Sequence, residues 1–370
     1  MRLYHALYNL IYSYLNFIEK LNFRTICKKF NKYLITDMYD IDYKYRDNLN
    51  ENILKQHAYI TKLNLSTCYV PNLNFLSSLK ELNINFSEIG DDCIKNLNLE
   101  KLSANDNRKL TKIKHMTQLK FLNIGNNSGV NNDEINDLFE LKTLFAWDND
   151  KITTIKHMTK LKYLNIGLGC GVNDSELTNL NLKGLRAHGN NKITKIRHMT
   201  SLTELDISGE CGVNNDEIAS LNLKKLIARN NVKITKIKHM QLLKYLDISN
   251  SCGVGDEEIA NLNLIMLNAH KNKKITKIKH MNLLTRLDIS DTNVNDEEIA
   301  NLNLILLSAY DNNKITKIKH MNSLKYLNIG GKCGIDVNEI NNQNNSKILI
   351  SSTPNCHMLW SDTILNLWNQ

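Results

Sequence analysis

A unit of about 41 residues recurs along most of this chain, and the repeat limits what the chain can fold into. It is clearest at His239–Lys279, which reads HMQLLKYLDISNSCGVGDEEIANLNLIMLNAHKNKKITKIK. The same His-Met pair also begins at positions 115, 157, 198, 280 and 320. A fixed period of this length is typical of solenoids, in which each unit buries its apolar face against its neighbours. We therefore expect one repeat array rather than several separate domains.

Each unit divides into two unlike halves of about 20 residues. Both halves follow the spacing LxxLxL, with a Cys or an Asn a few positions later. The first half ends in an acidic stretch, and the second ends in Lys-Ile-Thr-Lys-Ile. In the unit above, the residues that define the two halves are Leu243, Leu246, Ile248 and Cys252, then Leu264, Leu267, Ala269 and Asn272.

These halves resemble leucine-rich repeats over roughly residues 60–350. The resemblance implies an α/β fold, a leucine-rich-repeat solenoid or horseshoe of about 14–15 rungs. Parallel strands would form the concave sheet, and short helices or turns would lie on the convex side. The resemblance also implies that one recurrent Asn is buried, where its amide can pair with backbone groups. Its copies are Asn107, Asn149, Asn190, Asn231, Asn272 and Asn312.

The expected strand centres are separated by steps of 19 to 22 residues, so no linker interrupts the array. They are Leu63, Leu82, Leu102, Leu122, Leu144, Leu164, Leu185, Leu205, Leu226, Leu246, Leu267, Leu287, Leu307 and Leu327. We expect residues 36–60 to form a short helix and a loop into the first rung. Residues 347–350 are a possible last rung. The predicted segments are 1–40, a helical segment; 41–60, a connector; 61–350, the repeats; and 351–370, an amphipathic C-terminal cap.

The first 35 residues carry apolar side chains at helical spacing and match no repeat. They resemble an F-box, with Ile11–Leu15 and Ile26–Phe30 at the family's two characteristic positions. Tyr4 stands where that family usually has Pro. The resemblance implies that this segment docks the adaptor of a cullin-RING ubiquitin ligase through Leu3, Leu7, Leu10, Ile11, Leu15, Leu21, Ile26, Cys27 and Phe30. The alternative is a plain helical cap over the first rung, which solenoids need for solubility.

Cysteine usage favours a reducing compartment. Four of the eight cysteines, Cys170, Cys211, Cys252 and Cys333, occupy one repeat position, two rungs apart. Strands lie about 4.8 Å apart, so these cysteines are about 10 Å from one another, too far for a disulfide. We expect a ladder of buried free thiols in a cytoplasmic or nuclear protein. The residue bias and degenerate repeats also resemble proteins of giant DNA viruses or amoebae, which would place the chain inside a host cell.

Several other classes of site are not expected. No run of 18 apolar residues predicts a transmembrane helix, and no small-residue cleavage site follows the N-terminus. The repeated histidines are about 10 Å apart, too far to share one zinc ion. No Gly-rich phosphate loop, HExxH, CxxC or nucleophile elbow is present. We therefore expect no catalysis, no metal, no cofactor, no small-molecule ligand and no membrane partner.

Lysines and acids alternate along the outer side of the array. Lys-Ile-Thr-Lys stretches carry the bases, and stretches such as Asp256-Glu257-Glu258 carry the acids. We expect a solvated surface with ion pairs between rungs, each worth at most about 1 kcal/mol. The alternative is a basic ridge for a polyanion, which the net charge of +9 would favour. The interleaved acids argue against a nucleic-acid ligand, because a phosphate backbone requires a continuous basic track.

The concave surface is the expected binding surface, because aromatic and Arg side chains are the usual anchors of interfaces. Strand positions that point outward carry Phe121, Phe145, Trp147, Tyr163, Arg186, His188, Asp206, Tyr245, Asp247, His270, Arg286, Asp288, Tyr310 and Tyr326. We predict a protein-interaction protein that holds a target on this surface and, through the F-box-like segment, serves as substrate receptor of a ubiquitin ligase. The alternatives are a binding module without a ligase and a polyanion-binding scaffold.

Overall fold

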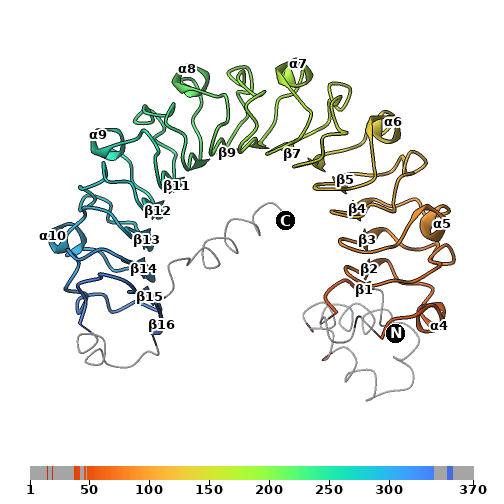
Figure 1. The fold of residues 1–370 in the computed structure, drawn as a ribbon, viewed down its shortest axis with the longest axis horizontal. Helices are drawn as coiled ribbons and strands as arrows, with labels where there is room; N and C mark the ends of the chain where they lie inside the picture. The colour runs from red at the N-terminus through yellow and green to blue at the C-terminus, as the bar shows by residue number, and fades with distance from the viewer. Residues whose placement is uncertain are drawn as a thin grey trace, which may run out of the picture. The chain divides into compact units, whose positions relative to one another are not determined.

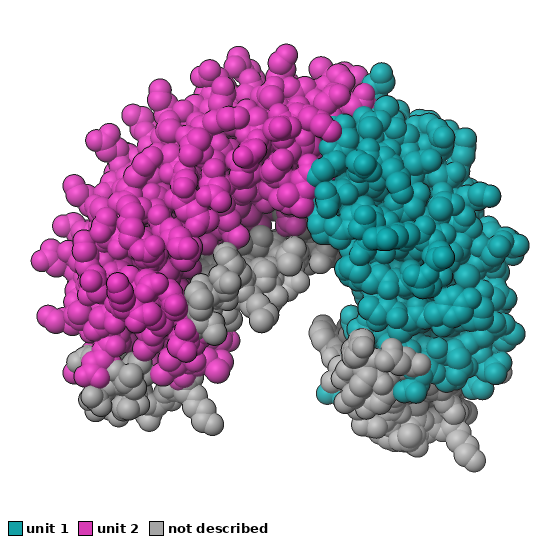
Figure 2. Space-filling model, viewed as in Figure 1, with its two compact units in different colours: residues 1–161, 169–172 teal, residues 162–168, 173–370 magenta. Residues whose placement is uncertain are grey.

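The computed structural model describes residues 37–41, 46, 48–336 and 348–352, with single positions at 15 and 19 (Figure 1). The chain forms two compact units. Unit 1 comprises residues 1–161 and 169–172, and unit 2 comprises residues 162–168 and 173–370 (Figure 2). Among the described residues, no helix has the length and apolar character to cross a membrane.

Unit 1 is a stack of short parallel strands in chain order. Its strands are β1 (Asp37–Met38), β2 (Lys62–Asn64), β3 (Glu81–Asn83), β4 (Lys101–Ser103), β5 (Phe121–Asn123) and β6 (Thr143–Phe145). Its helices are α4 (Glu51–Gln56), α5 (Asp91–Ile94) and α6 (Asn132–Ile135). Each strand pairs in parallel with the next, and Leu lies beside Leu at the strand centres, as in Leu82↔Leu102.

Unit 2 repeats the same arrangement. Its strands are β7 (Tyr163–Asn165), β8 (Gly184–Arg186), β9 (Glu204–Asp206), β10 (Lys225–Ile227), β11 (Tyr245–Asp247), β12 (Met266–Asn268), β13 (Arg286–Asp288), β14 (Leu306–Ser308), β15 (Tyr326–Asn328) and β16 (Leu349–Ser351). Its helices are α7 (Asp174–Leu177), α8 (Asn215–Ile218), α9 (Asp256–Ile259) and α10 (Asp296–Ile299). Within each unit the strands line the inner, concave side and the one-turn helices lie on the outer side (Figure 1).

The predicted solenoid is confirmed, and all 14 predicted strand centres are the middle residues of strands β2–β15. These leucines are at most 2% exposed, because each points between the sheet and the outer segments. The sequence did not predict β1, which lies within predicted segment 1–40 and pairs with β2 through Asp37↔Lys62. Met38 and Ile41 are buried against the array. The sheet therefore begins earlier than the leucine spacing indicates.

The recurrent Asn is buried in every copy, as the resemblance implied. At Asn272, Nδ2 donates to the carbonyl oxygens of Ile248 and Val254 at 2.9 and 3.1 Å, and Oδ1 accepts from Lys274 N at 3.1 Å. One amide thus satisfies three backbone groups where the chain leaves the strand and turns outward. Such groups would otherwise be buried without partners.

The outer side differs from the expected array of lysine–carboxylate pairs. Most helix carboxylates accept instead from backbone N–H groups of neighbouring rungs. Asp256 Oδ1 accepts from Thr276 N and Lys277 N at 2.7 and 3.1 Å, one rung ahead. Glu258 Oε2 accepts from Ile237 N at 2.7 Å, one rung behind. The Lys-Ile-Thr-Lys stretch is not helical, so its backbone N–H groups have no partners within a helix. The carboxylates accept hydrogen bonds from these N–H groups instead. Only some residues form the expected pairs, such as Lys114–Asp137.

The repeated His-Met pairs are structural, as expected. The Met of each pair is buried. The His ring of most pairs bonds the last residue of the preceding helix, as in His280 Nε2 and Ile259 O at 3.1 Å. Equivalent contacts are made by His157, His198, His239 and His320. The Ile259 carbonyl also accepts from Leu262 N at 3.0 Å, so the ring makes a second contact to a carbonyl at the helix C-terminus. In the part of the chain that the structure describes, no cluster could hold a metal ion.

The cysteine ladder is also present, with Cys170, Cys211 and Cys252 buried as free thiols and Cys333 partly exposed. Burial raises the pKa of Cys211 and of Cys252 to about 11. Because the thiolate is the reactive form, we predict that iodoacetamide at pH 8 leaves these two thiols unmodified in the folded chain and modifies both after denaturation. Mass spectrometry of the labelled peptides measures this. Rapid labelling of Cys252 in the folded chain would contradict the prediction.

Candidate functional site

Three outward-facing rows of side chains cross the strands of unit 2, and they form its sheet face. The start row consists of the first residue of each strand, and the end row consists of the third. The loop row consists of the second residue after each strand. The loop row is Gly167, His188, Ser208, Arg229, Ser249, His270, Ser290, Tyr310 and Gly330.

The start row carries charged residues at its middle strands β9 and β10 and is mainly apolar toward β16. Lys225 lies beside Glu204 on one side and Tyr245 on the other. Burial lowers the pKa of Lys225 to about 8, although Glu204 acts in the opposite direction. Further along, Met266 and Leu306 are buried, and the half-buried Tyr245 and Tyr326 pack against them. After Lys225 the row is therefore mainly apolar and aromatic, and Arg286 interrupts it between Met266 and Leu306.

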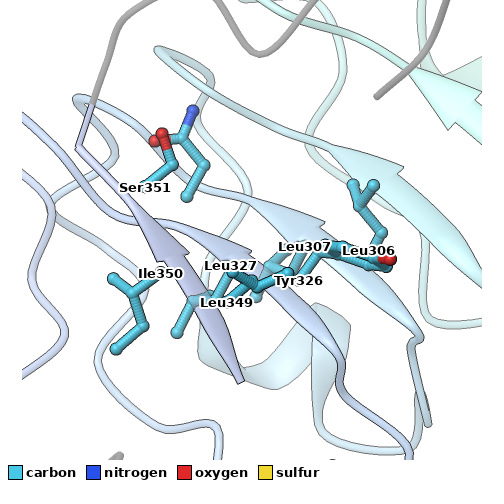
Figure 3. A pocket seen from close by; sticks show the side chains of 8 residues that line it. Leu306, Leu307, Tyr326, Leu327, Leu349, Ile350 and Ser351 are labelled. Atoms are coloured by element: carbon cyan, nitrogen blue, oxygen red, sulfur yellow. The ribbon is translucent and has the colours of Figure 1, made fainter. Parts of the chain in front are cut away.

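A cavity of about 200 Å³ lies at the apolar end of the start row (Figure 3). Strands β14, β15 and β16 supply its lining residues, which are Leu306, Leu307, Tyr326, Leu327, Asn328, Leu349, Ile350 and Ser351. Leu349 is 66% exposed and Ile350 is 49% exposed. Ile350 occupies the strand-centre position, where strands β2–β15 carry a Leu that is at most 2% exposed. The apolar core is therefore open to solvent at β16.

The end row carries aspartates that mainly hold the backbone in place. Asp206, Asp247 and Asp288 each accept, through Oδ1, the N–H of the residue two positions on. Asp247 Oδ2 also accepts from Arg229 Nε at 2.6 Å and from Asn268 Nδ2 at 3.0 Å. Asp247 and Asp288 are buried, although their strand positions predicted outward-pointing binding residues. These aspartates stabilise the turn after each strand, and Asp247 also orients Arg229.

The loop row alternates large and small residues. His188 lies flat against Gly167, where an added Cβ would come within 2.4 Å of the ring. Tyr310 lies in the same way against Gly330, where a Cβ would come within 2.3 Å. His188 also lies 4.0 Å from Asp206. The small residues thus make room for the large side chains, which remain half-buried on the sheet face.

Unit 1 presents its own group of aromatic side chains. Phe121 and Phe145 on the neighbouring strands β5 and β6 meet edge to face, with ring centroids 5.4 Å apart. Trp147 lies against Gly125, where a Cβ would come within 2.5 Å of Nε1. All three aromatic side chains are half-buried. This is the same large-over-small packing that His188 and Gly167 show in unit 2.

The structure places the predicted concave residues on the sheet faces of the two units. Phe121, Phe145 and Trp147 lie on unit 1; the others are Tyr163, Arg186, His188, Asp206, Tyr245, Asp247, His270, Arg286, Asp288, Tyr310 and Tyr326, on unit 2. The predicted adaptor-binding residues lie outside the described residues, apart from the single position Leu15. They are Leu3, Leu7, Leu10, Ile11, Leu21, Ile26, Cys27 and Phe30.

Sequence reasoning missed the residues that give unit 2 its polar and apolar ends. Lys225, Arg229, Met266 and Leu306 were overlooked because only aromatic residues and a few charged ones were selected. Aligning the first position of every strand would have shown the change of character. The open core at Ile350 had a signal too, because the leucine period decays before β16.

The comparisons with known proteins identify the fold. No family model matches the sequence, and no curated protein matches it. The functional domain of InlJ from Listeria monocytogenes, which includes a cysteine ladder, has a TM-score of 0.51 at 18% identity, covering 78% of this chain and 73% of that domain. An internalin, InlF, from Listeria monocytogenes has a TM-score of 0.49 at 18% identity, covering 74% of this chain and 88% of that one. A leucine-rich repeat protein of Leptospira interrogans has a TM-score of 0.47 at 19% identity, covering 78% and 94%.

Proposed function

We infer that this chain, which has a leucine-rich repeat fold, is a protein-interaction module. We propose that it binds a protein target on the sheet face of unit 2. The observation that carries this proposal is the set of half-buried aromatic and cationic side chains in the start and loop rows, from His188 to Tyr326. Tyr and Arg are enriched among residues that dominate interface energies. Side chains already ordered by packing lose less conformational entropy when a partner binds.

The packing on this face supports specific recognition rather than general adhesion. Arg229 is fixed by its hydrogen bond to Asp247, and His188 packs against Gly167. The residues at equivalent positions differ from rung to rung, so one partner sequence can be distinguished from another. The outer side offers less discrimination, because exposed acids such as Asp216 and Glu297 alternate with exposed lysines. This alternation also speaks against a polyanion ligand there.

The finer proposal is that the chain is the substrate receptor of a cullin-RING ubiquitin ligase, with residues 1–36 docking the adaptor. Its support is the resemblance of Ile11–Leu15 and Ile26–Phe30 to the two characteristic stretches of an F-box. The receptor would catalyse nothing itself. It would raise the local concentration of the target near the ligase.

A pull-down tests the ligase proposal. The full chain is compared with residues 37–370, a truncation that keeps β1 paired with β2. We expect the adaptor and the cullin to accompany the full chain and to be absent from the truncated one. Circular dichroism confirms that both proteins are folded. If the full chain is folded and recruits neither protein, the ligase proposal is wrong. Residues 1–36 would then be a cap, and the chain would be a binding module without a ligase.

A further inference from the structure

The end of the array at β16 presents an apolar surface with no cover among the described residues. Leu349 and Ile350 are 66% and 49% exposed, and they border the cavity between β14, β15 and β16 (Figure 3). Burying apolar surface contributes about 25 cal/mol per Å². Leaving a core position such as Ile350 in water is therefore unfavourable. Solenoids cover such ends with a capping segment.

The chain itself supplies a segment at this place. It leaves β16 at Ser351, which lines the cavity, and eighteen residues follow Ser352. The only formally charged side chain among them is that of Asp362. Their larger apolar residues are Met358, Leu359, Trp360, Ile364, Leu365, Leu367 and Trp368.

The spacing of these residues fits the cavity. Trp360, Ile364 and Trp368 recur every four positions, which places them on one face of a helix. A helix over 358–368 would be about 16 Å long. The three strands that line the cavity span about 10 Å, at about 4.8 Å from strand to strand. Residues 353–357 can reach about 16 Å when extended, enough to turn back from β16.

We propose that residues 353–370 dock as an amphipathic helix on β14–β16, with their apolar face in this cavity. The tether favours this occupant over a second copy of the chain, because a short linker gives an effective concentration in the millimolar range. Tyr326 and Leu306 then lie beneath the segment. If the proposed function is right, a target that uses this end of the start row must displace it.

Tryptophan fluorescence tests the docking in the full chain, without any partner. The chain has three tryptophans, so Trp147→Phe leaves Trp360 and Trp368 as the only emitters. We expect blue-shifted emission and weak quenching by acrylamide in this variant. Adding Leu349→Ser and Ile350→Ser should shift the emission to longer wavelength and increase quenching. Both changed residues are exposed, so the variant should still fold, which circular dichroism verifies.

The matched control is Leu283→Ser, a change at a similarly exposed leucine in another rung that should leave the emission unchanged. Solvent-exposed emission from the Trp147→Phe chain would overturn the proposal. So would burial that Leu349→Ser and Ile350→Ser do not affect. Burial that disappears on dilution would assign the surface to a second copy instead. None of these results bears on target binding, so the proposed function stands or falls separately.

Discussion

Replacing Asn272 by Ala should lower the free energy of unfolding by about 3–5 kcal/mol. The change leaves the carbonyls of Ile248 and Val254 and the N–H of Lys274 buried without their partner. Each unsatisfied buried group costs about 1–3 kcal/mol, and the lost side-chain volume adds a small cavity. Urea unfolding followed by circular dichroism measures the loss.

The control is Asn263→Ala in the same double unit. Asn263 is exposed, and its backbone carbonyl, which the variant keeps, accepts a hydrogen bond from Lys244 Nζ. Its unfolding midpoint should stay within the range of ordinary surface changes, about 0.5 kcal/mol. Equal effects of the two replacements would contradict the structural role assigned to the buried Asn.

The second large effect is expected at Asp296, where Ala should cost about 1–3 kcal/mol. Its Oδ1 accepts from Thr316 N and Lys317 N at 2.7 and 3.1 Å, and its Oδ2 accepts from the Thr316 hydroxyl. Ala leaves two backbone N–H groups without a protein acceptor, although solvent can reach them in part. The neighbouring Glu297 is exposed on the same helix turn, so Glu297→Ala is the matched control and should change little.

The chain also supplies a conservative replacement. Asn132 and Asn215 stand at the equivalent helix position and bind the same backbone groups. Asp296→Asn should therefore keep most of the stability that Ala loses. An Asn variant as unstable as the Ala variant would contradict the hydrogen-bond assignment.

Lowering the pH should remove the stability that the Asp296 carboxylate contributes to the fold. Burial alone would raise its pKa, but the hydrogen bonds from Thr316 and Lys317 and the charge of Lys317 together lower it. The group thus stabilises the fold above its unfolded pKa of about 3.9, and this contribution is lost as the pH falls through the folded pKa. The stability difference between the wild-type chain and Asp296→Asn should therefore shrink in acid. Urea midpoints at neutral and low pH measure it.

The repeat positions of the fold were readable from sequence because one rule applies fourteen times. Leu at a strand centre has a single environment, so its spacing located strands β2–β15. Strand β1 was not predicted, because Met38 and Ile41 do not follow this leucine spacing. The contacts between carboxylates and backbone N–H groups were not predicted either. A charged carboxylate in the sequence suggests an ion pair with Lys more readily than a hydrogen bond from a backbone N–H group. A recurring Asp or Asn twenty residues before a recurring Thr, as in Asp296 and Thr316, was the available signal.

The binding surface was only partly predictable. Residue type identified side chains such as Tyr245 and His188, because alternation along a strand fixes which positions face outward. It did not show that Asp247 is buried beneath Arg229. Nor did it show that Lys225 loses much of its contact with water. Such burial depends on the length and direction of neighbouring side chains across three rungs.

Site-specific photo-crosslinking tests most directly whether the sheet face of unit 2 holds the target. A photoreactive amino acid is placed at Tyr245 or His270 on the sheet face, and at the exposed positions Lys236 or Lys277 beside the helices. Each full-length variant is irradiated with a target that co-purifies with the wild-type chain. We expect crosslinks to that target from Tyr245 and His270 and none from the lysine positions. A target that crosslinks mainly from Lys236 and Lys277 would contradict the proposed binding surface.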